Sequence, residues 1–96
     1  LQRRRQRQMC IRDRFKVDQQ KSFDVTYKEN ILGTYIPDLI INDQIIIELK
    51  TIPKITNHEI GQMMNYLRVT NLAIGLLLNF KYSKLEWKRV IVSGLA

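Results

Sequence analysis

The chain has 96 residues, of which 45% are hydrophobic and 26% charged, with a formal net charge of +7. This length accommodates one small domain, and the apolar fraction is too high for a fully disordered chain. No apolar run reaches the roughly 18 residues that a membrane-spanning helix needs, so we expect no membrane partner. The single cysteine, Cys10, excludes a scaffold built on intrachain disulfides and favours a cytoplasmic, reducing compartment.

The positive charge is concentrated at the N-terminus. Residues 1–14 hold six arginines and one aspartate, whereas residues 15–96 hold ten basic and eight acidic side chains. A basic arm can bind phosphate backbones without sequence preference. However, RQRQMCIRDR resembles a translated sequencing adapter, and the chain starts with Leu. We therefore interpret residues 1–14 as a disordered, non-native tail without function, and residues 15–96 as the domain.

Three strands are expected in the first half of the domain. Residues 22–27 alternate apolar and polar side chains, as a half-buried strand does. A second strand is expected over residues 31–41, interrupted by Gly33 and by Pro37, which marks an edge, a bulge or a bend. Residues 45–50 form the third strand, whose three consecutive isoleucines indicate that both faces are covered. We expect these strands to form an antiparallel meander.

A helix is expected next, over residues 58–69. Thr56 or Asn57 supplies its N-cap, and Glu59 places a negative charge in its first turn. One apolar stripe runs along it at three- and four-residue spacing, formed by Ile60, Met63, Met64 and Leu67.

Two more strands follow the helix. Residues 72–80 are continuously apolar and predict a central strand buried on both faces. Residues 85–92 predict a last strand. The expected fold class is α/β, with a mixed sheet in the order β-β-β-α-β-β.

Three charged side chains interrupt the apolar strands. Glu48 and Lys50 share a face of their strand because strand side chains repeat every two residues. Asp38 reaches the same face if Ile41 lies opposite Ile45, which requires a three-residue hairpin loop. A two-residue loop would send Asp38 to the opposite face, unless a bulge reset the alternation.

Two carboxylates that converge on one face repel each other unless a cation lies between them. Mg²⁺ fits such a pair because it takes one or two carboxylates and keeps several waters. A lysine beside them can orient water or stabilise negative charge. The pattern therefore predicts metal-dependent phosphodiester hydrolysis, while the alternative is a surface ion pair at a strand end with Asp38 holding the bend.

The helix adds a polar stripe, formed by His58, Gln62 and Tyr66 at four-residue spacing. If this stripe covers the carboxylates, Gln62 could bind a metal-bound water or a phosphate, and His58 could contact phosphate or accept a proton. The alternative is a stripe that faces solvent, which we prefer for His58.

The stretches GTYIPDLIINDQIIIELK, HEIGQMMNYL and LAIGLLLNFKYSKLEWKRVIV resemble the GxxExxR protein family of the PD-(D/E)XK nuclease superfamily. The resemblance covers residues 17–92 and implies a restriction-endonuclease-like fold. It implies Asp38 and Glu48 as ligands of Mg²⁺, for which Mn²⁺ could substitute, with the Leu49 carbonyl as a third ligand. It also implies Lys50 as the catalytic cation and Gln62 as an auxiliary residue.

The namesake motif of that family lies on an N-terminal helix, and residues 1–16 do not match it. Without that helix one sheet face would be bare, which favours a homodimer. The main hypothesis is thus a Mg²⁺-dependent nuclease that acts on DNA or RNA. The alternatives are an inactive nucleic-acid-binding module that uses Lys81, Lys84, Lys88 and Arg89, and a dimerisation domain.

Overall fold

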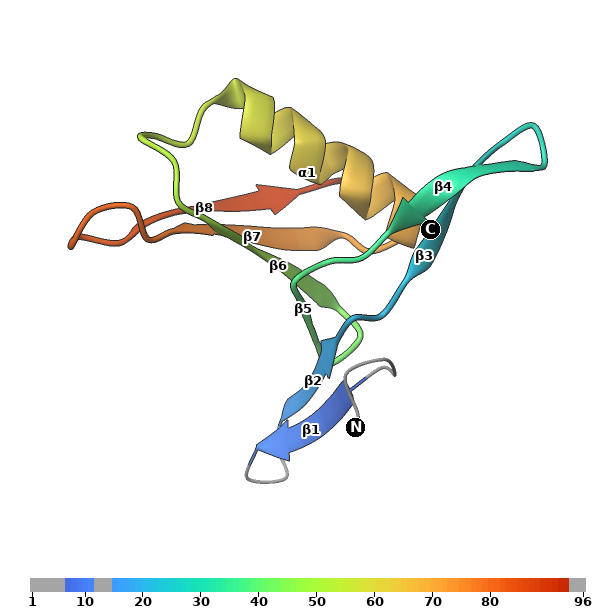
Figure 1. Ribbon diagram of the computed structural model, residues 1–96, viewed down its shortest axis with the longest axis horizontal. Coiled ribbons are helices and arrows are strands. Elements are labelled where there is room, and N and C mark those ends of the chain that lie inside the picture. The colour runs from blue at the N-terminus through green and yellow to red at the C-terminus, as the bar shows by residue number, and fades with distance from the viewer. Residues whose placement is uncertain (1–6, 12–14, 94–96) are drawn as a thin grey trace.

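The computed structural model describes residues 7–11 and 15–93. Its elements, in chain order, are β1 (Arg7–Ile11), β2 (Phe15–Gln19), β3 (Phe23–Tyr27), β4 (Asn30–Tyr35), β5 (Leu39–Ile41), β6 (Ile45–Lys50), α1 (Asn57–Thr70), β7 (Ile74–Asn79) and β8 (Glu86–Ile91). Six strands form one sheet in the order β1-β2-β5-β6-β7-β8, and β3 and β4 form a second, two-stranded sheet. Helix α1 lies on one face of the large sheet, packed against β7 and β8, and also contacts β3 (Figure 1).

The large sheet is mixed. Strands β6 and β7 are parallel and are joined through α1, whereas their outer neighbours β5 and β8 pair with them antiparallel. A parallel pair needs a crossover connection, and α1 supplies it. The expected α/β class with a restriction-endonuclease-like mixed sheet is confirmed.

Helix α1 is defined by local signals at both ends. Thr56 is the N-cap, and its side chain and that of Glu59 form a reciprocal capping box. The helix ends at Thr70, and the next residue, Asn71, has the left-handed backbone (φ 62°) typical of a C-terminal cap. The expected helix is therefore confirmed, with one additional residue at each end. Met63 and Leu67, from the expected apolar stripe, are fully buried against the sheet.

The strand expected over residues 31–41 is divided into β4 and β5. Strand β2 pairs with β5, and β3 pairs with β4, so residues 15–41 form one long ribbon that bends between its two halves. Pro37 lies at the bend, where its missing N–H cannot contribute to a ladder. The expected three-stranded meander is therefore wrong, because β3 pairs only with β4 and stays outside the large sheet.

The structure also contains two strands that the sequence pattern did not predict. Strand β2 pairs with β5, and β1 pairs with β2 at the edge of the large sheet. The expectation of a disordered tail is thus wrong for Arg7–Ile11, because the outer edge of β2 offers backbone groups that a further strand can pair with. Residues 1–6 and 12–14, the rest of that segment, lie outside the described residues.

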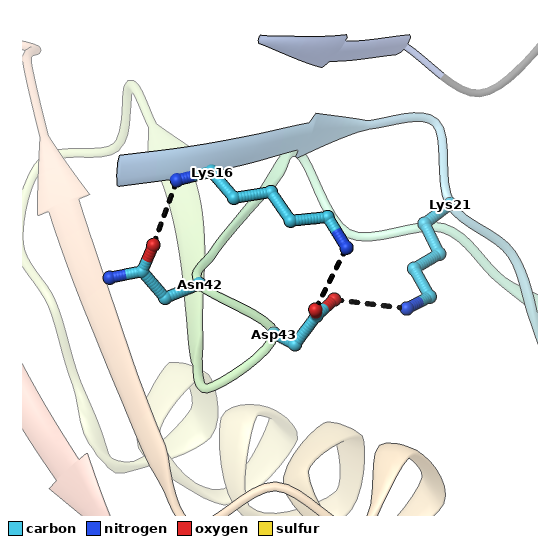
Figure 2. A network of polar contacts seen from close by, with 4 residues as sticks. All are labelled: Lys16, Lys21, Asn42 and Asp43. Carbon is cyan, nitrogen blue, oxygen red and sulfur yellow. Dashed lines mark hydrogen bonds and ion pairs between the residues drawn. The ribbon is translucent and has the colours of Figure 1, made fainter. Parts of the chain in front are cut away.

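The hairpin between β5 and β6 has the register that the site requires. Ile41 lies opposite Ile45, and the loop between them has three residues. Asn42 and Asp43 adopt left-handed backbone conformations, which Asn and Asp tolerate better than most residues do. The carboxylate of Asp43 accepts from the ammonium groups of Lys16 (2.9 Å) and Lys21 (3.3 Å), as Figure 2 shows.

The Asn42 side chain adds a second connection between the loop and β2. Its Oδ1 accepts from the backbone N–H of Lys16 at 2.8 Å (Figure 2). The backbone N–H of Asn42 donates in turn to the Lys16 carbonyl at 2.7 Å. These contacts hold the loop against β2 and so support the register of the hairpin.

The two faces of the large sheet differ in burial. Along β6 and β7, the residues that face α1 are buried, apart from the half-buried Lys50, and the alternate residues are half-buried or exposed. No described element covers the second face, on which Leu49, Trp87 and Ile91 are about half exposed or more. The expectation that both faces are covered is therefore wrong for these strands, because α1 shields one face alone. Among the described residues, no helix is long and apolar enough to cross a membrane.

Candidate metal and catalytic site

Asp38 and Glu48 come together where the ribbon bends. The pairing of β5 with β6 ends at Leu39 opposite Ile47, and Asp38 and Glu48 are the next residues along the two chains. The charge of Asp38 lies close enough to act on Glu48. The Oδ2 atom of Asp38 accepts from the backbone N–H of Leu49 at 2.8 Å, so the bend is fixed to β6. The three-residue loop therefore brings the two carboxylates to one face, as the sequence analysis required.

Glu48 is largely removed from water, with a relative exposure of 9%. Burial raises the pKa of its carboxyl group, and the charge of Asp38 raises it further. The Tyr35 hydroxyl, the backbone N–H of Asp38 and the positive charge of Lys50 oppose this rise. A buried carboxylate beside a second carboxylate is costly, and a bound divalent cation would relieve that cost.

Tyr35 is a site residue that the sequence analysis missed. It lies at the end of β4, is 9% exposed, and donates a short hydrogen bond to Oε2 of Glu48. Burial and the carboxylate of Glu48 raise the pKa of Tyr35, so its hydroxyl stays protonated as a donor. A tyrosine two residues before the Pro-Asp bend carries no distinctive sequence signal, because aromatic residues are common in strands.

Tyr66 packs against Tyr35 from the helix. The two rings are stacked, with centroids 3.9 Å apart and an angle of 12° between their planes. Burial, followed by the charge of Glu48, raises the pKa of Tyr66. The sequence analysis placed Tyr66 on the polar stripe of α1, and the structure shows that this residue faces the carboxylates.

Lys50 and Gln62 are also brought together. Lys50 lies two residues beyond Glu48 on β6, and its Nζ donates to Oε1 of Gln62 at 3.2 Å. The expected approach of Gln62 to the site is therefore present in the structure. The amide of Gln62 restricts the long lysine side chain, whose ammonium group is a mobile point charge when it has no partner.

His58 takes no part in this cluster. It lines an open groove of about 600 Å³ along the exposed side of α1, together with Asn57, Gly61, Gln62, Met64, Asn65 and Arg68. Gln62 is thus the residue of the polar stripe that belongs both to the groove and to the carboxylate site.

The lysines and the arginine of the binding-module hypothesis do not form one surface. Lys88 lies opposite Leu77 and Arg89 lies opposite Leu76, so these two cations project from opposite faces of the sheet. Both are exposed, as are Lys81 and Lys84 in the preceding loop. Their placement gives little support to a continuous basic surface on β8.

Asn79 is a second residue that the sequence analysis missed. It is 2% exposed and lies opposite Lys50 in the parallel ladder. Its Oδ1 accepts from the backbone N–H of Ile52 at 3.0 Å, and its Nδ2 donates to the Ile52 carbonyl at 2.7 Å. Its Nδ2 also donates to Glu86, which accepts from the N–H of Ile55. Asn79 therefore holds the connection between Lys50 and α1.

The donor set fits a hard divalent cation. Two oxygen ligands from Asp38 and Glu48 suit Mg²⁺, which keeps most of its waters when one or two carboxylates bind it. Among the described residues, no group of three or more His, Cys, Asp and Glu side chains is gathered for a metal. The two carboxylates therefore suit a divalent cation that keeps most of its coordinated waters.

One comparison with known proteins identifies a family for this chain. The family model of the PD-(D/E)XK nuclease superfamily matches residues 8–90, which is most of the chain. No curated protein and no solved structure matches the chain at a significant level.

Proposed function

The chain belongs to the PD-(D/E)XK nuclease superfamily, and from this premise we propose that it hydrolyses phosphodiester bonds of nucleic acid with Mg²⁺ as its cofactor. Divalent metal ions are usual in this superfamily, and nucleic acid is the substrate that its name implies. The observation that carries the proposal is the convergence of Asp38, Glu48 and Lys50 on one side of the bend.

In this proposal Asp38 and Glu48 are the side-chain ligands of the ion, and the Leu49 carbonyl is a third ligand. The bound ion would supply an activated water and a positive charge beside the scissile phosphate. The Asp38 side chain is suited to this role because the N–H of Leu49 already fixes its Oδ2 atom.

Lys50 has the chemical role in the proposal. Its ammonium group stabilises the negative charge that develops on the phosphate, or orients the attacking water. Gln62 accepts a hydrogen bond from that ammonium and so directs it, while the adjoining groove on α1 offers room for the strand being cut.

A finer assignment, to the GxxExxR family, rests on the order of four motifs. These are the P-D and E-x-K pair, the Q-x-x-N-Y-L helix, the G-L-L-L-N-F strand and the K-L-E-W-K-R strand. A homodimer through the uncovered sheet face is a further part of the proposal, supported by the exposure of Trp87 and Ile91 on that face.

The test is a Mn²⁺ titration followed by electron paramagnetic resonance, with Mg²⁺-dependent cleavage of labelled DNA and RNA measured in parallel. Asp38→Ala should lose both metal binding and cleavage. Lys50→Ala should keep metal binding and lose cleavage by about 10²-fold or more. Salt-sensitive binding of nucleic acid, with no metal binding by the wild-type protein, would instead identify an inactive binding module.

A further inference from the structure

The hydrogen bond from Tyr35 to Glu48 is buried and connects two strands that do not pair with each other. Tyr35 ends β4 in the small sheet, whereas Glu48 lies in β6 of the large sheet. The bend at residues 36–38 separates the two halves of the ribbon, so this bond spans it. It therefore fixes the side chain of Glu48 relative to an element outside its own sheet.

Tyr35 is itself held in place. Its ring stacks on Tyr66 of α1, at 3.9 Å between centroids, and its backbone lies opposite Phe23 in the small sheet. A stacked, buried ring has little rotational freedom, and its hydroxyl is the only group that it can offer to a neighbour. The orientation of this hydroxyl is thus set before any ligand arrives.

Glu48 needs such a partner more than Asp38 does. A glutamate side chain has one more rotatable bond than an aspartate, and Asp38 is already anchored by the N–H of Leu49. The ammonium of Lys50 lies close enough to act on Glu48 through its charge, but it donates its hydrogen bond to Gln62. The Tyr35 hydroxyl is therefore the side-chain donor that orients the Glu48 carboxylate.

We propose that Tyr35 is a positioning residue for the metal site: its hydroxyl holds Glu48 in the orientation in which the carboxylate binds the divalent ion. This inference rests on the proposed function, since it takes Glu48 to be a ligand. Carboxylates that bind metals are commonly hydrogen-bonded by such outer partners, and loss of the partner typically weakens metal binding by about 10- to 100-fold.

The experiment compares Tyr35→Phe with Tyr27→Phe in the full chain, with Mn²⁺ as the probe. Both changes remove one phenol oxygen, but Tyr27 is 60% exposed at the end of β3 and is not among the residues that act on Glu48. Tyr35→Phe should raise the Mn²⁺ dissociation constant about tenfold and change the shape of the bound Mn²⁺ spectrum. Tyr27→Phe should change neither.

Thermal melts followed by circular dichroism establish that each variant is folded at the temperature of the titration. Tyr66→Leu is a second, independent variant, since it keeps the Tyr35 hydroxyl and removes the ring that holds it. A loss of Mn²⁺ affinity in Tyr66→Leu that is smaller than the loss in Tyr35→Phe would support the proposal.

Three results would overturn the inference. If folded Tyr35→Phe binds Mn²⁺ as the wild type does, Tyr35 has a structural role alone, and the proposed function stands provided that Asp38→Ala abolishes binding. If Tyr27→Phe weakens binding as much as Tyr35→Phe does, the effect is not specific to the bond with Glu48. If the wild-type protein binds no Mn²⁺, the proposed function and this inference both fail.

Discussion

Asn79 illustrates how one buried amide can secure the chain that leaves the candidate site. Its side chain pairs with both the N–H and the carbonyl of Ile52, which lies two residues after Lys50. A side chain that mimics a strand in this way satisfies backbone groups that have no sheet partner. The position of Lys50 therefore depends on a residue of the neighbouring strand as well as on β6 itself.

We expect Asn79→Ala to destabilise the protein by about 2–3 kcal/mol, because backbone groups of Ile52 would lose their partner in a buried setting. The free energy of unfolding, measured by urea titration, is the test. Asn65→Ala is the matched control, since Asn65 is exposed and its side chain accepts a hydrogen bond from Arg68 at 3.4 Å; its effect should stay within about 0.5 kcal/mol. Equal effects of the two changes would contradict this role of Asn79.

The residues of the site were predictable to different degrees. Four of them stand out in the sequence because a charged or polar side chain in an apolar or amphipathic segment is costly to bury without a partner. They are Asp38, Glu48, Lys50 and Gln62. Tyr35 and Asn79 do not stand out, since a tyrosine in a strand and an asparagine at a strand end are ordinary. Their roles arise from pairing across the sheet and from stacking on α1, which no local pattern encodes.

At the level of elements, the negative charge of Glu59 in the first turn of α1 should make the stability of the helix depend on pH. The backbone N–H and hydroxyl of Thr56 donate to Glu59 and hold the pKa of that carboxyl below its usual value of 4.5. Because the folded-state pKa is lowered, the contribution of Glu59 is complete above pH 4.5 and is lost as pH falls through the lower, folded-state value.

Glu59→Gln tests this prediction, since glutamine keeps the shape of the cap and removes the charge. Wild type should be more stable than the variant near pH 7, and the difference should shrink once pH falls below about 4.5. Thermal melts at a series of pH values measure the difference. A gap that stays constant down to pH 2 would contradict a role for the charge.

The close packing of α1 on β7 depends on Gly75, which has no side chain and lies beneath the large side chain of Met63. A Cβ added at Gly75 would lie 2.5 Å from Sδ and 2.8 Å from Cγ of Met63, which is fully buried. Gly75→Ala should therefore cost about 1–3 kcal/mol by overpacking. Gly61→Ala, at a half-buried position of α1 where a Cβ meets nothing within 4 Å, should instead stabilise the helix by about 0.5–1 kcal/mol.

A double-mutant cycle separates overpacking from other effects of the alanine. If Met63 is the obstacle, Gly75→Ala should cost less in a Met63→Ala background than in the wild type, because the smaller side chain leaves space. Urea titration of the four proteins measures this coupling. Strictly additive effects would show that Met63 is not what excludes a side chain at position 75.

Local patterns predicted some elements better than others. The N-cap candidate, the acidic first turn and the apolar stripe are all local signals, so the sequence predicted α1 to within one residue at each end. The sequence indicated an interruption at Pro37, but it did not predict that the two halves of the strand would join different sheets. Long-range pairing decides which strand each half joins, and no local pattern encodes it. For the same reason β1 and β2 were missed.

At the scale of the whole molecule, the unequal faces of the large sheet have a physical consequence. One face packs on α1, and the other exposes aliphatic and aromatic side chains that include Trp87 (61%) and Ile91 (55%). The sequence suggested full burial because runs of isoleucine and leucine are typical of strands covered on both sides. Such a pattern predicts a covered face without revealing what covers it.

We expect this face to drive self-association, because contiguous apolar patches that remain in water favour contact between molecules. Sedimentation equilibrium of the wild-type chain should show a monomer–dimer equilibrium in the micromolar range. Trp87→Lys and Ile91→Lys, which place a charge on the face, should each weaken dimerisation by about tenfold or more.

Ile31→Lys is the matched control for this prediction. Ile31 is 65% exposed, which is close to the exposure of Trp87 and Ile91. However, it lies on β4 in the small sheet, away from the uncovered face. The same charge there should leave the dimer unchanged, since exposed apolar area alone is not enough to form a specific contact. If all three lysine variants weaken association equally, general hydrophobicity and not the uncovered face is responsible.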